Sequence, residues 1–469
     1  MTAPTTTAPT PGTARGTMPG SRHDTAPRLT VDRFVDGREP DAHAMLPRFT
    51  TAVSADVGIV RLLAEERDYY NDEPATLLHR AEVAPTSRLS SSGYPRRAAE
   101  GGRGFDAGTT TVGALFEAFE RYSLSVYREE SLVHGSHASL AGQGVRALAP
   151  SRFLCALNAT DDDRRHADGV ERAWVRGTSL ASGDAVLVPA QTVFLPYYAP
   201  DDEGYLRDPL TTGAAAGLSP AAAARRGLLE AVERDALMLM HYRQLVPDRL
   251  DARTVADDRL AELLRDARRH HLDLRLFRIP TDLPVHVVVA QVLDRSGVGP
   301  EMTLGSKASL SLTDAMVGAL LEAVCFRRGL RERQEYARQY AERHLHSGSD
   351  INCLEERTYY WTQPGRSAQL SYLERAGAPA DPAAFAERAG SMRRLVEGIL
   401  DGVGDIVLVD VTTDDIREMG VSVVKAVVPE LQPMHLAEPL RVFTRRLLSF
   451  GARHGQGTQP PSDAPHPFL

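Results

Sequence analysis

The sequence predicts an α+β fold in which helices and strands are mixed along one chain. Two long segments, residues 109–130 and 219–244, carry apolar residues at helical spacing. Elsewhere, short runs rich in Val and Leu are bounded by Gly, Pro and Ser, as in residues 174–197. Hydrophobic residues make up 42% and charged residues 25% of the 469 residues, which excludes a mainly disordered, collagen-like or coiled-coil chain.

Composition divides the chain into three regions. Residues 1–29 are mostly Thr, Pro and Ala, and we expect a disordered tail because they bury too little apolar surface to offset their ordering entropy. Residues 30–450 hold the regular patterns and are expected to form one large domain. Residues 451–469 are rich in Gly and Pro and are expected to form a second tail.

Local patterns predict the elements of the domain in chain order. The first half is expected to hold an apolar opening at 52–68, a Ser/Gly/Arg-rich loop at 81–104, a helix at 109–130, a surface segment at 148–172, and two strands within 174–197 around a turn at 182–184. The second half is expected to hold helices at 219–244 and 256–271, strands at 272–280 and 284–294, a helix at 311–346 broken near Gly329, and strands at 405–413 and 421–429 around a short helix. Ser219 and Pro220 predict the start of the first of these helices, as a cap followed by proline.

The charges and cysteines exclude several classes of protein. Net charge is −8, from 54 basic and 62 acidic residues, without the basic stripe of a nucleic-acid-binding protein. Only Lys307 and Lys425 are lysines, and neither fits a phosphate loop. Three scattered cysteines give no disulfide framework or metal pair. No apolar run could span a bilayer and the N-terminus lacks the order of a signal peptide, so we expect a cytoplasmic protein.

An internal echo of two acidic helices is the most informative motif. Glu117-Ala-Phe-Glu120-Arg recurs as Glu230-Ala-Val-Glu233-Arg at a constant offset, and a weaker third copy carries Glu322. Residues three apart share a helical face, so each of the first two helices places two carboxylates side by side on a largely apolar surface. If the helices face each other, the four carboxylates form a cup of the oxygen ligands that Mg²⁺ prefers. The alternative is that these glutamates are exposed and pair with the arginines that follow them.

These stretches together resemble the YcaO family. The matching segments include GRGFDAGTTTVGALFEAFERYS and AAAGLSPAAAARRGLLEAVERDA, and the full set is 102–123, 174–190, 214–236, 305–328 and 409–433. The match extends over roughly residues 55–469 in the family's order. The sequence looks most like the peptide-modifying branch that forms azoline rings, whose C-terminus alternates prolines. Residues 465–468 fit that pattern, with Leu469 where a proline is usual.

The resemblance implies an ATP- and Mg²⁺-binding fold and a set of site residues. The implied metal ligands are Glu117, Glu120, Glu230 and Glu233; the implied ATP contacts are Arg103, Glu120, Arg234 and Glu322; and the implied catalytic residues are Glu117, Glu233 and Leu469. Arg103 stands where the family usually has lysine. Other departures from the family's pattern are Gly113 for serine, Leu218 for asparagine, Ala222 for glutamate and Gly318 for arginine.

The resemblance also implies a reaction. A Cys, Ser or Thr side chain of a ribosomally made peptide attacks the preceding amide carbonyl, and phosphorylation by ATP lets the former amide oxygen leave, giving a thiazoline or oxazoline. The substituted polar positions motivate an alternative, a non-catalytic scaffold or partner protein of such a complex. A third possibility is a related enzyme that forms thioamides or amidines.

The same resemblance predicts the partners. They are a ribosomal precursor peptide and a separate leader-peptide-binding protein, because the family match fills nearly all of the chain and leaves no room for that module. A homodimer is possible, and neither nucleic acid nor a membrane is expected as a partner.

Overall fold

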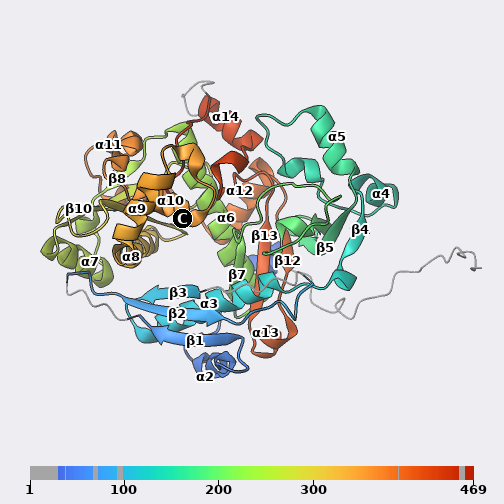
Figure 1. Cartoon of the computed structure of the whole chain (residues 1–469), viewed down its shortest axis with the longest axis horizontal. Coiled ribbons are helices and arrows are strands. Elements are labelled where there is room, and N and C mark those ends of the chain that lie inside the picture. The colour runs from blue at the N-terminus through green and yellow to red at the C-terminus, as the bar shows by residue number, and fades with distance from the viewer. Residues whose placement is uncertain are drawn as a thin grey trace, which may run out of the picture.

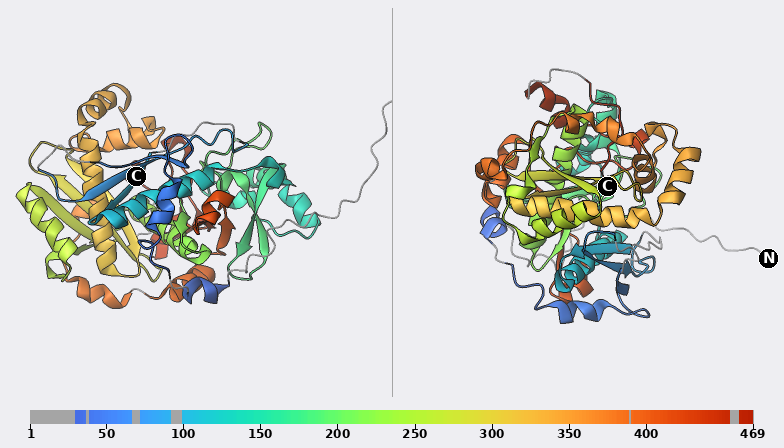
Figure 2. Two further views of the ribbon diagram at one scale, coloured as in Figure 1. Left: turned by 90° about the horizontal axis from the view of Figure 1, so that it is seen from below. Right: turned by 90° about the vertical axis from the view of Figure 1, so that its left-hand side faces the viewer.

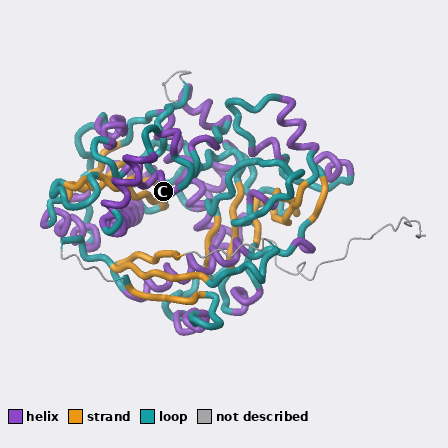
Figure 3. Tube along the Cα trace, viewed as in Figure 1, coloured by secondary structure: helices purple, strands orange, loops and turns teal. Residues whose placement is uncertain are grey.

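Three antiparallel sheets and the helices packed on them organise the chain, shown as a computed structural model in Figure 1. The structure describes residues 30–36, 39–66, 72–91, 99–388, 390–453 and 460–468. Figure 3 shows that strands, helices and loops are interspersed along the trace. This arrangement confirms the predicted α+β class.

The first sheet is three-stranded and runs along the base of Figure 1, in the order β1 (Val60–Glu65), β2 (Leu77–Val83) and β3 (Ala99–Gly104). The expectation of a loop over 81–104 was therefore wrong at both of its ends, while residues 92–98 lie outside the described part. Helix α3 (Ala107–Ser125) packs on this sheet. A Cβ on Gly102 would overlap the backbone of Thr110 and Ala114, so the glycine is what lets β3 lie directly against the helix.

The second sheet has the strand order β11 (Met302–Ser309), β10 (His286–Asp294), β9 (Leu272–Arg278) and β8 (Asp248–Leu250). Helices α7 (Asp258–Arg269) and α8 (Leu312–Arg331) share a hydrophobic core with it. The strands at 272–280 and 284–294 were predicted, but β11 and β8 were not. In the right-hand view of Figure 2, the blue strands of the first sheet lie below the green and yellow elements of this one.

The third sheet is six-stranded. Its main path is β4 (Val133–Gly135), β5 (Arg172–Ser179), β12 (Val407–Asp410), β13 (Ser422–Val427) and β7 (Ala214–Gly217), and β6 (Ala185–Pro189) pairs with the other side of β5. The predicted hairpin over 174–197 and the two predicted C-terminal strands are confirmed. The alanine-rich strand β7 was not predicted; it joins the sheet because Val424 pairs with Ala215 in an antiparallel ladder.

Two of the helices that connect the sheets begin at capping residues. Asp106 caps α3 by accepting from the Thr109 amide at 2.8 Å, and Ser219 caps α6 (Pro220–Arg243) by accepting from the Ala222 amide at 3.1 Å. The predicted break near Gly329 in the helix at 311–346 is confirmed: α8 ends at Arg331, and α9 (Gln334–His344) begins after two intervening residues. The predicted helices at 109–130, 219–244 and 256–271 are confirmed with slightly different ends.

The remaining helices are short and cover the sheets. They are α1 (Val31–Asp36), α2 (Leu46–Phe49), α4 (His137–Gly142), α5 (Asp161–Gly169), α10 (Leu354–Trp361), α11 (Ser371–Glu374), α12 (Met392–Gly402), α13 (Asp414–Glu418) and α14 (Arg445–Arg453). Helix α5 lies within the predicted surface segment, and the three aspartates at its start, Asp161 to Asp163, are exposed. None of the helices in the described ranges has both the length and the apolar character needed to cross a membrane.

The division into three regions stays a prediction, since residues 1–29 lie outside the described part. Helix α14 runs across the boundary expected at residue 450. Within the predicted C-terminal tail, residues 465–468 are buried. All three cysteines are free, and Cys325 is buried.

Candidate functional site

Two arginines connect the acidic helices. Arg121 of α3 pairs with Glu120, lies 3.3 Å from Glu117 on the same helix (Nη2 to Oε1), and interacts electrostatically with Glu230 of α6. This pair of helices is therefore brought together as the echo predicts. The alternative is right that Arg121 pairs with both glutamates, but Glu120 and Arg121 are only 13% and 17% exposed, so the pair does not lie on the open surface.

The second connecting residue is Arg103 of β3. Its Nη2 lies 3.0 Å from Glu322 Oε1 on α8, and its charge also interacts with Glu117 and Glu233. Burial lowers the pKa of Arg103, but these carboxylates outweigh it and hold the pKa above its ordinary value. Residues from both echo helices and from the third copy thus surround one guanidinium.

Strand β11 fixes two of the carboxylates in place. The Ser306 hydroxyl and the Ala308 amide each donate to Glu233 at 2.6 Å, and the Ser306 amide donates to Glu322 at 2.6 Å. Glu233 is only 6% exposed, so these donors replace water around a buried charge. In the described part of the chain its hydrogen bonds come from β11 and not from Arg234, which differs from the surface-pair alternative.

The surroundings of Glu230 disfavour the ionised form of its carboxylate. Burial and the neighbouring Glu233 raise its pKa, against the opposing effect of Arg234 and Arg121. The Gly213 amide donates to it at 3.3 Å. A divalent cation beside Glu230 would relieve that cost, because it stabilises the ionised form.

Lys425 of β13 lies on the other side of the same cluster. Its ammonium donates to the carbonyls of Val193 and Leu210 and interacts electrostatically with Glu230 and Glu120. Burial, together with the nearby Arg207, lowers its pKa to about 7. Sequence reasoning did not place this lysine at the site; the only signal was the rarity of lysine in the chain.

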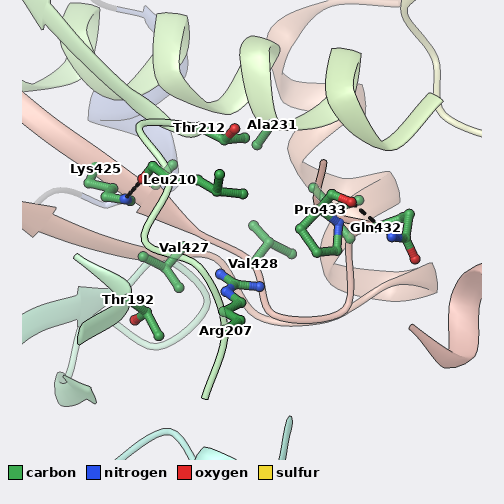
Figure 4. Close-up of a pocket in the computed structure, with 12 residues that line it drawn as sticks. Thr192, Arg207, Leu210, Thr212, Ala231, Lys425, Val427, Val428, Gln432 and Pro433 are labelled. Atoms are coloured by element: carbon green, nitrogen blue, oxygen red, sulfur yellow. Dashed lines mark hydrogen bonds between the residues drawn. The ribbon is translucent and has the colours of Figure 1, made fainter. Parts of the chain in front are cut away.

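A small cavity of about 40 Å³ lies beside Lys425. Figure 4 shows Lys425 and Arg207 among its lining residues, together with Ala231, which lies between Glu230 and Glu233 on α6. A larger cavity of about 400 Å³ is lined by α5 and by segments around residues 154–159, 203–206 and 440–442, and contains none of the predicted site residues. The smaller cavity is likewise lined by none of the predicted site residues, and it adjoins the acidic cluster only through Lys425 and Ala231.

The donor set fits a nucleotide with a hard cation. The cluster supplies carboxylate oxygens, the ligands that Mg²⁺ prefers. The Arg234 Nε is buried without a hydrogen-bond partner in the described structure, so it is available to an anionic acceptor such as a phosphate oxygen. Together these groups offer ligands to a cation and donors to the oxygens around it.

Leu469 lies outside the described residues, but the segment before it is held firmly. His241 Nε2 of α6 lies 2.9 Å from the Ala464 carbonyl, and Arg357 and Trp361 of α10 donate to the His466 carbonyl at 2.9 and 3.0 Å. Figure 1 places the C-terminus beside α10. His241 is eight residues after Glu233, so the segment crosses α6 about 12 Å along the helix from the acidic cluster.

A second group of possible metal ligands also lies at this segment and was not predicted. Donor atoms of His435, Glu438 and His466 lie within 4.8 Å of one another, all buried. Arg357 donates to Glu438 at 2.6 Å and already balances its charge. The group is thus explained as a structural anchor for the C-terminal segment.

An acidic cluster on three helices, supplied with arginines and an unpartnered donor, defines a protein that binds a divalent cation and an anionic ligand. The comparison with known families specifies the class: residues 101–432 match the family described as YcaO cyclodehydratase, ATP- and Mg²⁺-binding. The chain belongs to the YcaO family. ATP and Mg²⁺, the cofactors that the sequence predicts, are those named in the family's description.

Individual relatives support the fold. An uncharacterised protein of Methanothermobacter thermautotrophicus is 26% identical over 355 residues, covering 73% of this chain and 84% of the relative. A heterocyclase solved in complex with substrate and cofactor has a TM-score of 0.70 at 19% identity, covering 92% of this chain; the chain spans 57% of that heterocyclase.

Two further solved structures share the fold. The YcaO protein of Methanopyrus kandleri, bound with AMPPCP and Mg²⁺, has a TM-score of 0.56 at 23% identity and covers 80% of this chain and 86% of its own. A chain of the E. coli microcin synthetase McbBCD complex has a TM-score of 0.54 at 16% identity, with coverages of 78% and 87%. These similarities confirm the predicted fold class.

Proposed function

We propose that the chain is an ATP- and Mg²⁺-dependent cyclodehydratase that forms thiazoline or oxazoline rings from Cys, Ser or Thr in a ribosomally made peptide. The observation that carries the proposal is the convergence of glutamates from α3, α6 and α8 around Arg103 and Arg121. Placing several like charges together in a partly buried site costs free energy unless a cation compensates them.

The proposal assigns roles to the residues of the cluster. Glu117, Glu120, Glu230 and Glu233 hold the metal, with Glu117 and Glu233 essential to the reaction, while Arg103, Glu120, Arg234 and Glu322 contact ATP. Bound Mg²⁺ neutralises the charge that develops on the transferred phosphoryl group. Ser306 and Ala308 position Glu233, which limits the reorganisation that metal binding requires.

The C-terminal segment is proposed to help position the peptide. It is anchored to α6 and α10, and Leu469 follows directly after the buried Phe468. The anchor would hold the chain immediately before Leu469 in place, so the proposed role of Leu469 depends on it.

A separate leader-peptide-binding protein is the proposed partner, and a homodimer is a possible assembly. Support comes from the solved relatives, since one heterocyclase was captured with its substrate and the microcin synthetase is a complex. We also propose a cytoplasmic location, where a newly made precursor peptide and ATP are both available.

The test is co-expression with the precursor peptide and partner protein encoded beside the gene, followed by mass spectrometry of the peptide. The wild-type chain is expected to remove one water per ring formed. Glu117→Gln and Glu233→Gln are expected to abolish this loss, while Glu342→Gln on the exposed surface of α9 leaves it unchanged. Ring formation by both site variants at the wild-type rate would contradict the metal role.

The substituted polar positions favour one second candidate, a non-catalytic scaffold. Ala222 is fully buried at the start of α6 and Leu218 is half-buried, so neither offers the polar group that the family usually has there. Titration calorimetry with ATP and Mg²⁺ distinguishes the two, because a scaffold shows no binding alone or with its partner. A thioamide- or amidine-forming enzyme would bind ATP but give a different product by mass and fragmentation.

A further inference from the structure

Both lysines of this chain lie at the acidic cluster, although lysine occurs only twice in 469 residues. Lys425 interacts with Glu230 and Glu120 from one side. Lys307 stands on β11 between Ser306 and Ala308, the two residues that bind Glu233. All other formal cationic side chains are arginines, so a compact ammonium is used only here.

The two faces of β11 serve different helices. The side-chain hydroxyl of Ser306 donates to Glu233 of α6, whereas Gly305 lies against α8, where an added Cβ would be 2.9 Å from the Cβ of Glu322. Successive side chains of a strand point to opposite faces, so Lys307 shares the α8 face with Gly305. Lys307 is therefore on the Glu322 side of the cluster.

The aliphatic part of Lys307 lies against the bare backbone of Gly318. A Cβ on Gly318 would be 2.8 Å from Cγ of Lys307 and 3.3 Å from both its Cβ and its Cδ. Gly318 precedes Glu322 by one helical turn and shares its face. A side chain added at position 318 would therefore compete for this space with the stem of Lys307.

The ammonium of Lys307 remains available. The side chain is exposed, and within the described residues its Nζ makes no hydrogen bond or ion pair. Arg103, by contrast, is already paired with Glu322. A fixed stem that ends in an unpaired cation beside a cation-binding carboxylate cluster is preorganised for an anionic oxygen.

We propose that Lys307 contacts the polyphosphate of the bound nucleotide and supplies from β11 the positive charge that Gly318 of α8 lacks. This inference rests on the proposed function. Position 318 is where the family usually has arginine, and the stem of Lys307 lies against the bare backbone of Gly318, so the proposed cation is carried by the neighbouring strand. On this inference, the glycine at position 318 no longer favours a site that binds no nucleotide.

The test measures binding of AMPPCP with Mg²⁺ by titration calorimetry. Lys307→Met keeps the stem against Gly318 and removes only the charge, so affinity should fall about tenfold, as for the loss of one charge-assisted contact. Lys307→Arg should stay within about threefold of wild type, since it restores the charge. Arg268→Ala, which removes an exposed cation from α7, serves as the matched control and should bind as wild type.

A relocation variant makes the test specific. Lys307→Gly combined with Gly318→Arg returns the cation to α8 and should recover most of the affinity lost in Lys307→Met, with folding checked by circular dichroism. Lys307→Met that binds AMPPCP as tightly as wild type overturns the inference alone. A wild-type chain that binds no AMPPCP with Mg²⁺, with or without its partner, overturns the proposed function and the inference with it.

Discussion

The guanidinium of Arg103 lies 3.0 Å from the carboxylate of Glu322. Arg103 belongs to the three-stranded sheet and Glu322 to the helix that follows the four-stranded sheet, so the pair joins two parts of the fold at the acidic cluster. Arg103 is 39% exposed and Glu322 22%, which leaves the pair accessible to a ligand. A partly exposed ion pair contributes little to folding stability, so we expect this pair to matter for ligand binding.

Replacing Arg103 should therefore affect ligand binding more than folding. Arg103→Ala is expected to weaken binding of AMPPCP with Mg²⁺ about tenfold, because a charge-assisted contact is lost. Arg103→Lys should keep most of the affinity, since lysine preserves the charge. Titration calorimetry gives the affinities, and thermal unfolding should shift by only a few degrees. Equal affinity for Arg103→Ala and wild type would contradict an ATP role for Arg103.

Ser306 is expected to act through Glu233. Its hydroxyl donates to the buried carboxylate at 2.6 Å, so Ser306→Ala leaves one oxygen with reduced hydrogen bonding and freer to rotate. We expect AMPPCP–Mg²⁺ affinity to fall about tenfold, the lower end for residues that orient metal ligands. Ser309→Ala, on the same strand but away from the carboxylates, is the control. If both serine variants bind alike, Ser306 has no positioning role.

The sequence predicted the acidic helices well and the strands beside them poorly. Helices α3 and α6 carry strong apolar periodicity and clear caps, such as Ser219, so local signals suffice. Strand β7 consists of Ala and Gly, and β3 consists of Ala and Gly apart from Glu100 and Arg103, so neither shows an alternation of large apolar residues. They form because small residues permit close contact with a helix, as Gly102 does, and that requirement is set by tertiary packing.

The same distinction applies to the site. The repeated glutamates were visible in the sequence because each pair lies within one helix. Ser306 and Lys425 contact glutamates 73 and more than 190 residues away, and no local pattern reports such contacts. The rarity of lysine was a usable signal, since rare residue types in one chain can mark a common location.

A network of buried ion pairs that involves α8 should contribute strongly to the free energy of unfolding. Arg327 pairs with Glu73 and, at 2.7 Å, with Asp294, and all three side chains are almost completely buried. Arg327→Met leaves two buried carboxylates with less compensation and should reduce the free energy of unfolding by about 3–5 kcal/mol. Urea denaturation measures this change. Arg338→Met on the exposed surface of α9 should cost less than about 1 kcal/mol.

Stability should also depend on pH through the histidines that anchor the C-terminal segment. Burial lowers the pKa of His241 to about 4, against the opposing effects of its hydrogen bond to the Ala464 carbonyl and of the charge of Glu438. Burial also lowers the pKa of His435 and of His466. The charge of Arg357 also lowers the pKa of all three histidines. In the unfolded chain these side chains have a pKa near 6.5, so below that pH the unfolded state binds more protons.

The sign of the pH effect follows from these pKa values. The contribution of the histidines to stability is fully present above about pH 6.5 and is lost as the pH falls toward about 4, by about 3 kcal/mol for His241 alone. Urea midpoints measured across that range should fall with pH, and His241→Gln should make the fall shallower. His134→Gln, an exposed residue of β4, should leave the profile unchanged. A profile equally steep in His241→Gln would show that other groups control the acid response.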